Sequence, residues 1–172
     1  PGALAGVWAE ENTRESIFDA LQRRETFGTS GNRMLLRFFA GWNFPVDIEE
    51  EMNLAEMGYR HGVPMGADLP QNTSAKAPKF LIWAAKGVDG QKLQRAQIIK
   101  GWIEKGENKE RVYDVLCSDG LHPDPQHHRC PDNGATVDLS DCSVSEDAGA
   151  NELRGNWVDP DFNSAERAFY YL

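Results

Sequence analysis

Apolar and polar residues alternate along most of this chain in short runs, a pattern typical of β-strands. The first run, "LAGVWA" at residues 4–9, has the continuous apolar character of a buried strand. Later runs follow at spacings typical of an antiparallel β-sandwich, at residues 33–42, 79–87, 93–105, 110–117, 151–158 and 167–172. The predicted fold class is therefore α+β and mainly β.

Two neighbouring runs, 93–105 and 110–117, are predicted to form a hairpin. The intervening "KGENK" supplies turn residues, and Ala96, Ile98 and Trp102 fall on one face of the first strand. This hairpin belongs to the sandwich-like domain, which we assign to residues 33–172.

Helical periodicity is clearest just after the first strand. Ile17, Phe18 and Leu21 recur at helical spacing, and Asn12 is predicted to be the N-cap, with Glu15 reaching back in a capping box. The helix is expected to begin at residue 13 and to leave helical geometry at Gly28. Residues 1–32 then form a strand-helix unit.

Two segments interrupt the strand pattern. Residues 47–58 have weak helical character. The segment "GVPMGADLP", which follows a few residues later, is rich in Gly and Pro and is predicted to form turns. Residues 118–150 form a long polar loop, and a loop of that length inside a compact domain is usually functional, stapled or disordered.

Charge and composition exclude some partners. The 172 residues carry a net charge of -9 with scattered basic residues, so no stripe exists that could neutralise a nucleic-acid backbone. No apolar run approaches the length of a membrane span, and the first residues do not have the pattern of a signal peptide.

The cysteines Cys117, Cys130 and Cys142 lie in or beside the long loop. In an oxidising compartment one pair would staple this loop, whereas a reduced protein would keep three thiols. We expect a disulfide here, with one cysteine left over, and a secreted or periplasmic location. The sequence does not say which pair forms.

The stretch "WAEENTR" is the first candidate for chemistry. Glu10, Glu11, Asn12 and Arg14 follow a buried strand, and in α/β barrels the loops after strands hold the active site. The simpler interpretation is a capped helix with acids at the positive end of its dipole.

The stretch "RRETFGTSGNR" is the second candidate. Its two glycines could expose an anion-binding nest near Arg23, Arg24 and Arg33. However, it follows the helix instead of preceding it, which favours a helix C-cap and a turn.

The loop histidines are the third candidate. His122, His127 and His128 could ligate a metal with Cys130, but their spacing matches no standard zinc site. Solvated loop residues are the simpler interpretation.

The stretch "DPDFN" begins like a calcium loop with Asp159 and Asp161. Ser164 stands where that loop requires glycine, and Tyr170 stands where it requires glutamate. A proline-containing turn is the better prediction.

Ordered motifs along the chain carry a family resemblance. They are "LAGVWAEENTRESIFDALQRRETFGTSGNRMLLRFFAGW", "GVPMGADLP", "IIKGW", "RVYDVLCSDG", "CPDNGATVDLSDC" and "WVDPDFNSAERAFYYL". In this order they resemble the C-terminal part of the bacterial family called domain of unknown function 3604. Its members are similar to metal-dependent phosphoesterases of the polymerase-and-histidinol-phosphatase type.

The resemblance implies that residues 1–32 are the terminal strand-helix unit of a distorted TIM-like barrel, followed by the sandwich. It makes Glu10, Glu11 and Asn12 neighbours of an active site. The family's His-x-His and Asp-x-His metal motifs do not occur here and would lie upstream of Pro1, and the tail that follows "AFYY" in the family would hold a partner for the odd cysteine. The chain is then a segment of a longer protein.

The function expected from this resemblance is a non-catalytic C-terminal segment of a metal-dependent hydrolase. The segment itself would hold no cofactor, whereas the parent protein would hold manganese or zinc and act on a small-molecule substrate. The segment's main partner would be the rest of the parent chain. The alternative is a β-sandwich module that binds a carbohydrate or a protein through Trp42, Trp83 or Trp102.

Overall fold

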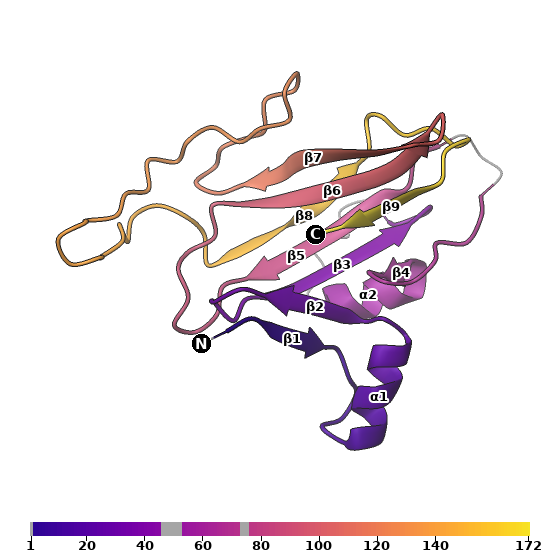
Figure 1. Ribbon diagram of the computed structural model, residues 1–172, viewed down its shortest axis with the longest axis horizontal. Coiled ribbons are helices and arrows are strands. Elements are labelled where there is room, and N and C mark those ends of the chain that lie inside the picture. The colour runs from indigo at the N-terminus through magenta and orange to yellow at the C-terminus, as the bar shows by residue number, and fades with distance from the viewer. Residues whose placement is uncertain (1, 46–52, 73–75) are drawn as a thin grey trace.

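The structure is a computed structural model that describes residues 2–45, 53–72 and 76–172. It is mainly β with short helices (Figure 1). The elements are β1 (Leu4–Val7), α1 (Arg14–Gln22), β2 (Thr26–Thr29), β3 (Leu35–Gly41), α2 (Leu54–His61), β4 (Val63–Pro64), β5 (Lys79–Ala85), β6 (Arg95–Glu104), β7 (Glu107–Cys117), β8 (Glu152–Val158) and β9 (Ala168–Tyr171).

Two antiparallel sheets form the predicted sandwich. One has the strand order β4-β3-β5-β8 and the other the order β7-β6-β9. Because successive strand residues point to opposite faces, alternate residues of each sheet meet between them. The shared core consists of Phe38, Phe80, Ile82, Ala96, Ile98, Tyr113, Val115 and Leu153. Every strand predicted from the apolar runs is present, whereas β2 and β4 were not foreseen.

The outer face of the four-stranded sheet is covered by α2. Phe39 and Leu81 point to this face and pack with Leu54 and Phe44 in a second buried cluster. The helix lies so close to the sheet that a side chain at Gly58 would run into the ring of Phe39. As a result, the C-terminal half of α2 lies at the same end of the sheet as β4.

The predicted hairpin is confirmed as β6-β7, with its turn at Lys105 and Gly106 in the left-handed region. Trp102 is only partly buried, unlike the core residues Ala96 and Ile98. A register shift opposite Ala96 inserts an extra residue into β7.

The N-terminal unit consists of β1, α1 and β2, and it lies along the lower edge of the molecule in Figure 1. The chain returns after α1 so that β2 pairs antiparallel with β1. No closed barrel is present in the parts of the chain that the structure describes.

Two predictions about α1 were wrong. Thr13 is the N-cap instead of Asn12, and its hydroxyl accepts a hydrogen bond from the Ser16 amide at 3.3 Å, so Glu15 is not placed for a capping box. The helix ends at Gln22, because Arg24 adopts a left-handed φ of 63° and the β-prone residues after it pair with β1.

A disulfide closes the first part of the long loop, as the sequence predicted. Cys117 at the end of β7 forms a disulfide with Cys130, across a Cα–Cα distance of 5.7 Å, and Cys142 is free and exposed. A short bridge between Val137 and Val144 organises the tip of the loop.

The predicted helix at residues 47–58 is confirmed only in its second half, where α2 begins at Leu54. Its first part, residues 47–52, lies outside the described residues. None of the helices within the described ranges is long and apolar enough to cross a membrane.

Candidate functional site

A cleft of about 710 Å³ separates the N-terminal unit from the sandwich. Its walls come from the end of β1, the α1–β2 connection, β3, α2 and the segment after β4. The lining residues are Trp8, Ala9, Glu10, Gln22, Arg23, Arg24, Glu25, Arg37, Tyr59, Pro64, Ala67 and Asp68. The cleft thus combines two aromatic side chains with three guanidinium and three carboxylate groups.

Trp8 and Arg37 form the floor of the cleft. The indole N–H of Trp8 donates to the Leu36 carbonyl at 3.0 Å, which fixes the ring against β3. The Arg37 guanidinium stacks on this ring, 3.6 Å from its centroid. Because a guanidinium is planar and weakly hydrated, this stacking holds it in one orientation.

A chain of hydrogen bonds continues from Arg37 into the N-terminal unit. Its Nη1 donates to the Tyr59 hydroxyl at 2.7 Å, and that hydroxyl donates to Glu25 Oε1 at 2.7 Å. The other Glu25 oxygen accepts from Arg23, with an ion-pair distance of 3.0 Å. Glu25 is buried, so both of its oxygens need these partners. The network joins β3, α2 and the α1–β2 connection.

The electrostatics keep the Tyr59 hydroxyl protonated. Burial raises the pKa of Tyr59, and the hydrogen bond to Glu25 raises it further, although the nearby Arg37 charge acts in the opposite direction. The hydroxyl therefore remains a donor to Glu25 and an acceptor for Arg37 near neutral pH.

At the mouth of the cleft the charged side chains are largely exposed to solvent. Arg24 and Asp68 form an ion pair at 3.3 Å, with 62% and 93% of their side chains exposed. A pair so exposed contributes little stability and can rearrange around a ligand. Glu10 is also exposed here. The cleft can therefore offer charged groups of both signs to a polar small molecule.

Of the four residues predicted to border an active site, the structure places one at the cleft and three outside it. Glu10 lines the cleft. Glu11, Asn12 and Arg14 are exposed and do not line it, and the amide of Glu11 donates to Ser16 at 3.2 Å.

Sequence reasoning missed Arg37, Tyr59 and Glu25. One signal was present for Arg37, because it is the only charged residue inside the otherwise apolar run "MLLRFFAGW" of the predicted strand. Tyr59 and Glu25 gave no such signal, since they meet only through the packing of α2 beside the N-terminal unit.

The stretch "RRETFGTSGNR" contains the favoured helix C-cap, at Arg23, and its Gly28 lies in a strand instead of an anion-binding turn. Thr26–Thr29 is the strand β2, and Arg23 and Arg24 instead point their charges toward the cleft. Arg33 is exposed and lies outside the residues that line the cleft.

The loop histidines are spread over the surface. His127 pairs with Asp124 at 2.8 Å, His128 packs against Tyr113 with ring centroids 5.2 Å apart, and His122 is exposed. Within the described residues no group of three or more His, Cys, Asp or Glu side chains could hold a metal ion.

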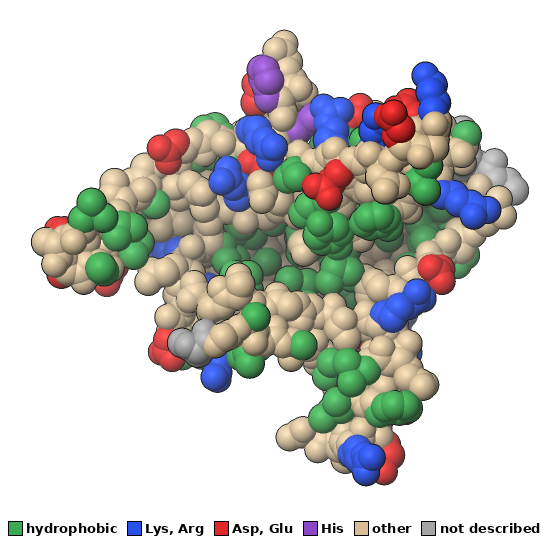
Figure 2. Space-filling view, viewed as in Figure 1, with side chains coloured by type: hydrophobic (Ala, Val, Ile, Leu, Met, Phe, Trp, Pro, Cys, Tyr) green, Lys and Arg blue, Asp and Glu red, His purple; other side chains and the backbone are tan. Residues whose placement is uncertain are grey.

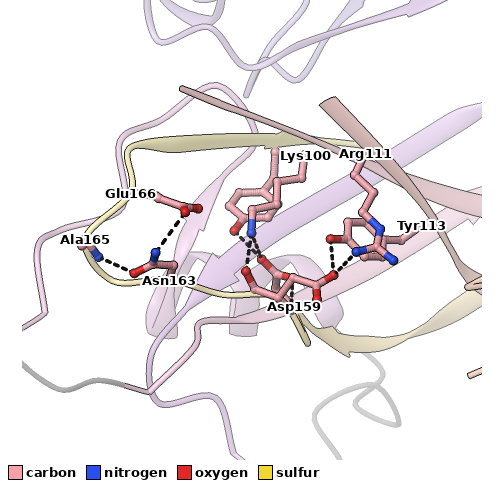
Figure 3. A network of polar contacts seen from close by, with 9 residues as sticks. Lys100, Arg111, Tyr113, Asp159, Asn163, Ala165 and Glu166 are labelled. Carbon is pink, nitrogen blue, oxygen red and sulfur yellow. Dashed lines mark hydrogen bonds and ion pairs between the residues drawn. The ribbon is translucent and has the colours of Figure 1, made fainter. Parts of the chain in front are cut away.

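A second polar cluster joins the strands β6, β7 and β9 to the segment that follows β8 (Figure 3). Lys100 and Asp159 form a buried ion pair at 2.6 Å, and the Tyr170 hydroxyl donates to the same carboxylate at 2.8 Å. Asp161 accepts from Arg111 and from the Tyr113 hydroxyl. The stretch "DPDFN" is therefore the predicted turn, and Asp159 locks it to the sheet.

This second cluster is not a binding site. The side chains of Lys100 and Asp159 are 3% and 0% exposed, and the ammonium group also donates to the Asp161 carbonyl at 2.7 Å. With its partners already supplied by the protein, the pair has no room for a ligand. The cleft remains the better candidate.

Comparison with known proteins gives one match. The family model described as Protein of unknown function (DUF3604) matches residues 1–172. No curated protein and no solved structure matches the chain. The match extends over the N-terminal unit, the sandwich and the stapled loop alike, and the chain therefore belongs to the DUF3604 family.

Proposed function

We propose that this chain is the non-catalytic C-terminal segment of a phosphoesterase-like, metal-dependent hydrolase, and that its cleft forms one wall of the substrate-binding site. The observation that carries the proposal is the position of the cleft. It opens where β1 runs into the loop bearing Glu10, which is the end of a strand where barrel hydrolases bind substrate.

The metal ions of such an enzyme would be held elsewhere. The described residues do not fit a divalent metal site, so this segment is assigned substrate contact and no metal chemistry. On this proposal manganese or zinc is bound by the rest of the parent chain, and β1 with α1 completes its distorted barrel.

Exposed apolar side chains support a contact with the rest of the parent. Phe18 and Leu21 on α1 are 55% and 49% exposed, and Figure 2 shows apolar side chains gathered on this helix. An amphipathic helix normally buries its apolar face. We propose that α1 packs against the remainder of the barrel.

The disulfide supports an oxidising location. Cys117–Cys130 is the kind of link found in secreted and periplasmic proteins, and we propose such a location for the parent.

Hydrolysis by the longer protein tests the proposed function. With manganese or zinc it should hydrolyse bis(p-nitrophenyl) phosphate, and EDTA should abolish the activity. Tyr59→Phe should lower kcat/KM because it breaks the Arg37–Tyr59–Glu25 network, whereas the control Tyr171→Phe alters only an exposed ring on β9.

Two outcomes count against the proposal. Metal-dependent turnover by residues 1–172 alone would show that the metal ligands have been misplaced. A longer protein that hydrolyses no phosphate ester with any divalent metal would remove the hydrolase assignment altogether.

The alternative, a binding module based on tryptophans, has less support. Trp42 donates to the Pro70 carbonyl at 2.8 Å, Trp83 packs beside the α2 cluster, and Trp102 lies near the Lys100 ammonium. All three are partly buried and they occupy separate places, so they do not form one platform for a sugar.

A further inference from the structure

We infer that Arg37 is the anchor for an oxyanion, a carboxylate or a phosphate, on the ligand of this cleft. The inference rests on the proposed function only in taking the cleft as a substrate site. It adds the chemical class of the ligand and names the residue that recognises it.

In the ranges that the structure describes, the charges around Arg37 leave it without a counter-ion. Glu25 is neutralised by Arg23, and Asp68 is paired with Arg24. Within the described part of the chain, no carboxylate forms an ion pair with Arg37, and its one hydrogen-bond partner is the neutral Tyr59 hydroxyl. Among the described residues, its positive charge thus has no ion-pair partner at the floor of the cleft.

The Arg37 side chain is also held in place before any ligand binds. The guanidinium is held by stacking on Trp8 and by one Nη1 hydrogen bond, and Trp8 is itself fixed to Leu36. A guanidinium carries five donors in a planar fork that matches a carboxylate or phosphate in a two-point contact. Most of the Arg37 donors are left for a ligand, and little ordering entropy remains to be lost on binding.

The rest of the cleft restricts the remainder of the ligand. Glu10 lines the same cleft as Arg37, and it would repel a second negative charge on the ligand. The volume of about 710 Å³ is large enough for a small organic molecule. The ligand class is therefore a small molecule with one oxyanion and an otherwise neutral or cationic, polar body.

Isothermal titration of residues 1–172 tests this inference without any need for hydrolysis. The probes are dimethyl phosphate and acetate, which each carry one negative charge, with glycerol as the neutral control. At least one anion should bind and glycerol should not, and comparison of the two anions shows whether phosphate or carboxylate is preferred. Arg37→Gln should weaken the binding roughly ten- to a hundredfold, the value of a hydrogen-bonded charge.

Two further variants separate recognition from stability. Glu10→Gln should tighten anion binding because it removes a repelling charge from the cleft, and this holds even if Arg37→Gln fails to fold. Arg60→Gln is the matched control, since Arg60 lies on α2, pairs with Glu56 and does not line the cleft. It should bind as the parent chain does.

The inference is overturned if neither anion binds, if Arg37→Gln binds anions as tightly as the parent chain, or if Glu10→Gln weakens the binding. Its failure is distinct from failure of the proposed function. Anion binding at Arg37 without hydrolysis by the longer protein would leave the site standing and remove the hydrolase assignment. Hydrolysis by the longer protein, with anion binding unchanged in Arg37→Gln, would support the hydrolase assignment and remove Arg37 as the anchor.

Discussion

Each buried charged side chain in the described part of the protein has several partners. Lys100 is buried and is satisfied by Asp159 and a backbone carbonyl, while Asp159 also accepts from Tyr170. Burial raises the pKa of Tyr170, and its hydrogen bond to Asp159 adds to that rise. The phenol therefore stays a donor, which allows the carboxylate to remain charged inside the sandwich.

Breaking this pair from one side should be severe. Asp159→Asn leaves the Lys100 ammonium buried without a counter-charge, which should lower the free energy of unfolding by about 3–5 kcal/mol. The measurement is urea denaturation followed by tryptophan fluorescence. The double variant Lys100→Met with Asp159→Leu should recover most of the lost free energy of unfolding. A double variant as unstable as Asp159→Asn would contradict this account.

Asp114 is the second buried carboxylate whose partners matter. Burial alone would raise its pKa, but hydrogen bonds from Gln97, the Cys130 amide and Arg129, together with the Arg95 charge, outweigh burial and hold the pKa below its ordinary value of 3.8. Since these donors come from β6 and from the long loop, Asp114 ties the loop to the sheet.

The sign of the resulting pH dependence follows from this lowered pKa. The stabilisation by Asp114 is present above its unfolded-state pKa and is lost as the pH falls through its lower folded-state pKa. The stability gap between the parent chain and Asp114→Asn should therefore shrink in denaturation series from roughly pH 5 to pH 2. Asp89→Asn, an exposed control, should show a smaller change, and a gap that widens in acid would contradict the assignment.

At the scale of elements, the long loop is the part that depends most on a covalent link. Figure 1 shows it reaching away from the sandwich between β7 and β8. Its first part is held by the disulfide and by the Asp114 amide, which donates to the His128 carbonyl at 3.0 Å. The rest contributes few buried side chains.

Removing the disulfide should therefore loosen the loop and destabilise the fold. The Cys117→Ser, Cys130→Ser double variant should lose about 3 kcal/mol, the value expected when a loop of this size is no longer closed. Amide hydrogen exchange at Asp114 should accelerate in the same variant. Cys142→Ser is the control and should change neither property, because that cysteine is free and exposed.

At the scale of the whole molecule, much of the architecture follows from the apolar pattern. Strands such as β3 and β5 were predictable because both faces of their sheet are buried, one by the second sheet and one by α2, which leaves a long apolar run. The strands β2 and β4 could not be predicted from the pattern, since they are short and pair at an edge.

The candidate site was only partly predictable, for a physical reason. Trp8 and Glu10 belong to a stretch whose composition already suggested chemistry, and both line the cleft. Arg37, Tyr59 and Glu25 are far apart in the sequence and become one network only when α2 and the N-terminal unit meet. A contact between distant segments leaves no local pattern that a single sequence can reveal.

The central claim is that the cleft around Trp8 and Arg37 is where this protein meets its ligand. Titration of dimethyl phosphate into residues 1–172, followed by nitrogen–proton NMR spectra, tests it most directly. The account predicts that the largest shifts occur at the Trp8 indole N–H and the Arg37 guanidinium N–H. Shifts spread over the exposed lysines and arginines, with Trp8 and Arg37 unmoved, would contradict it.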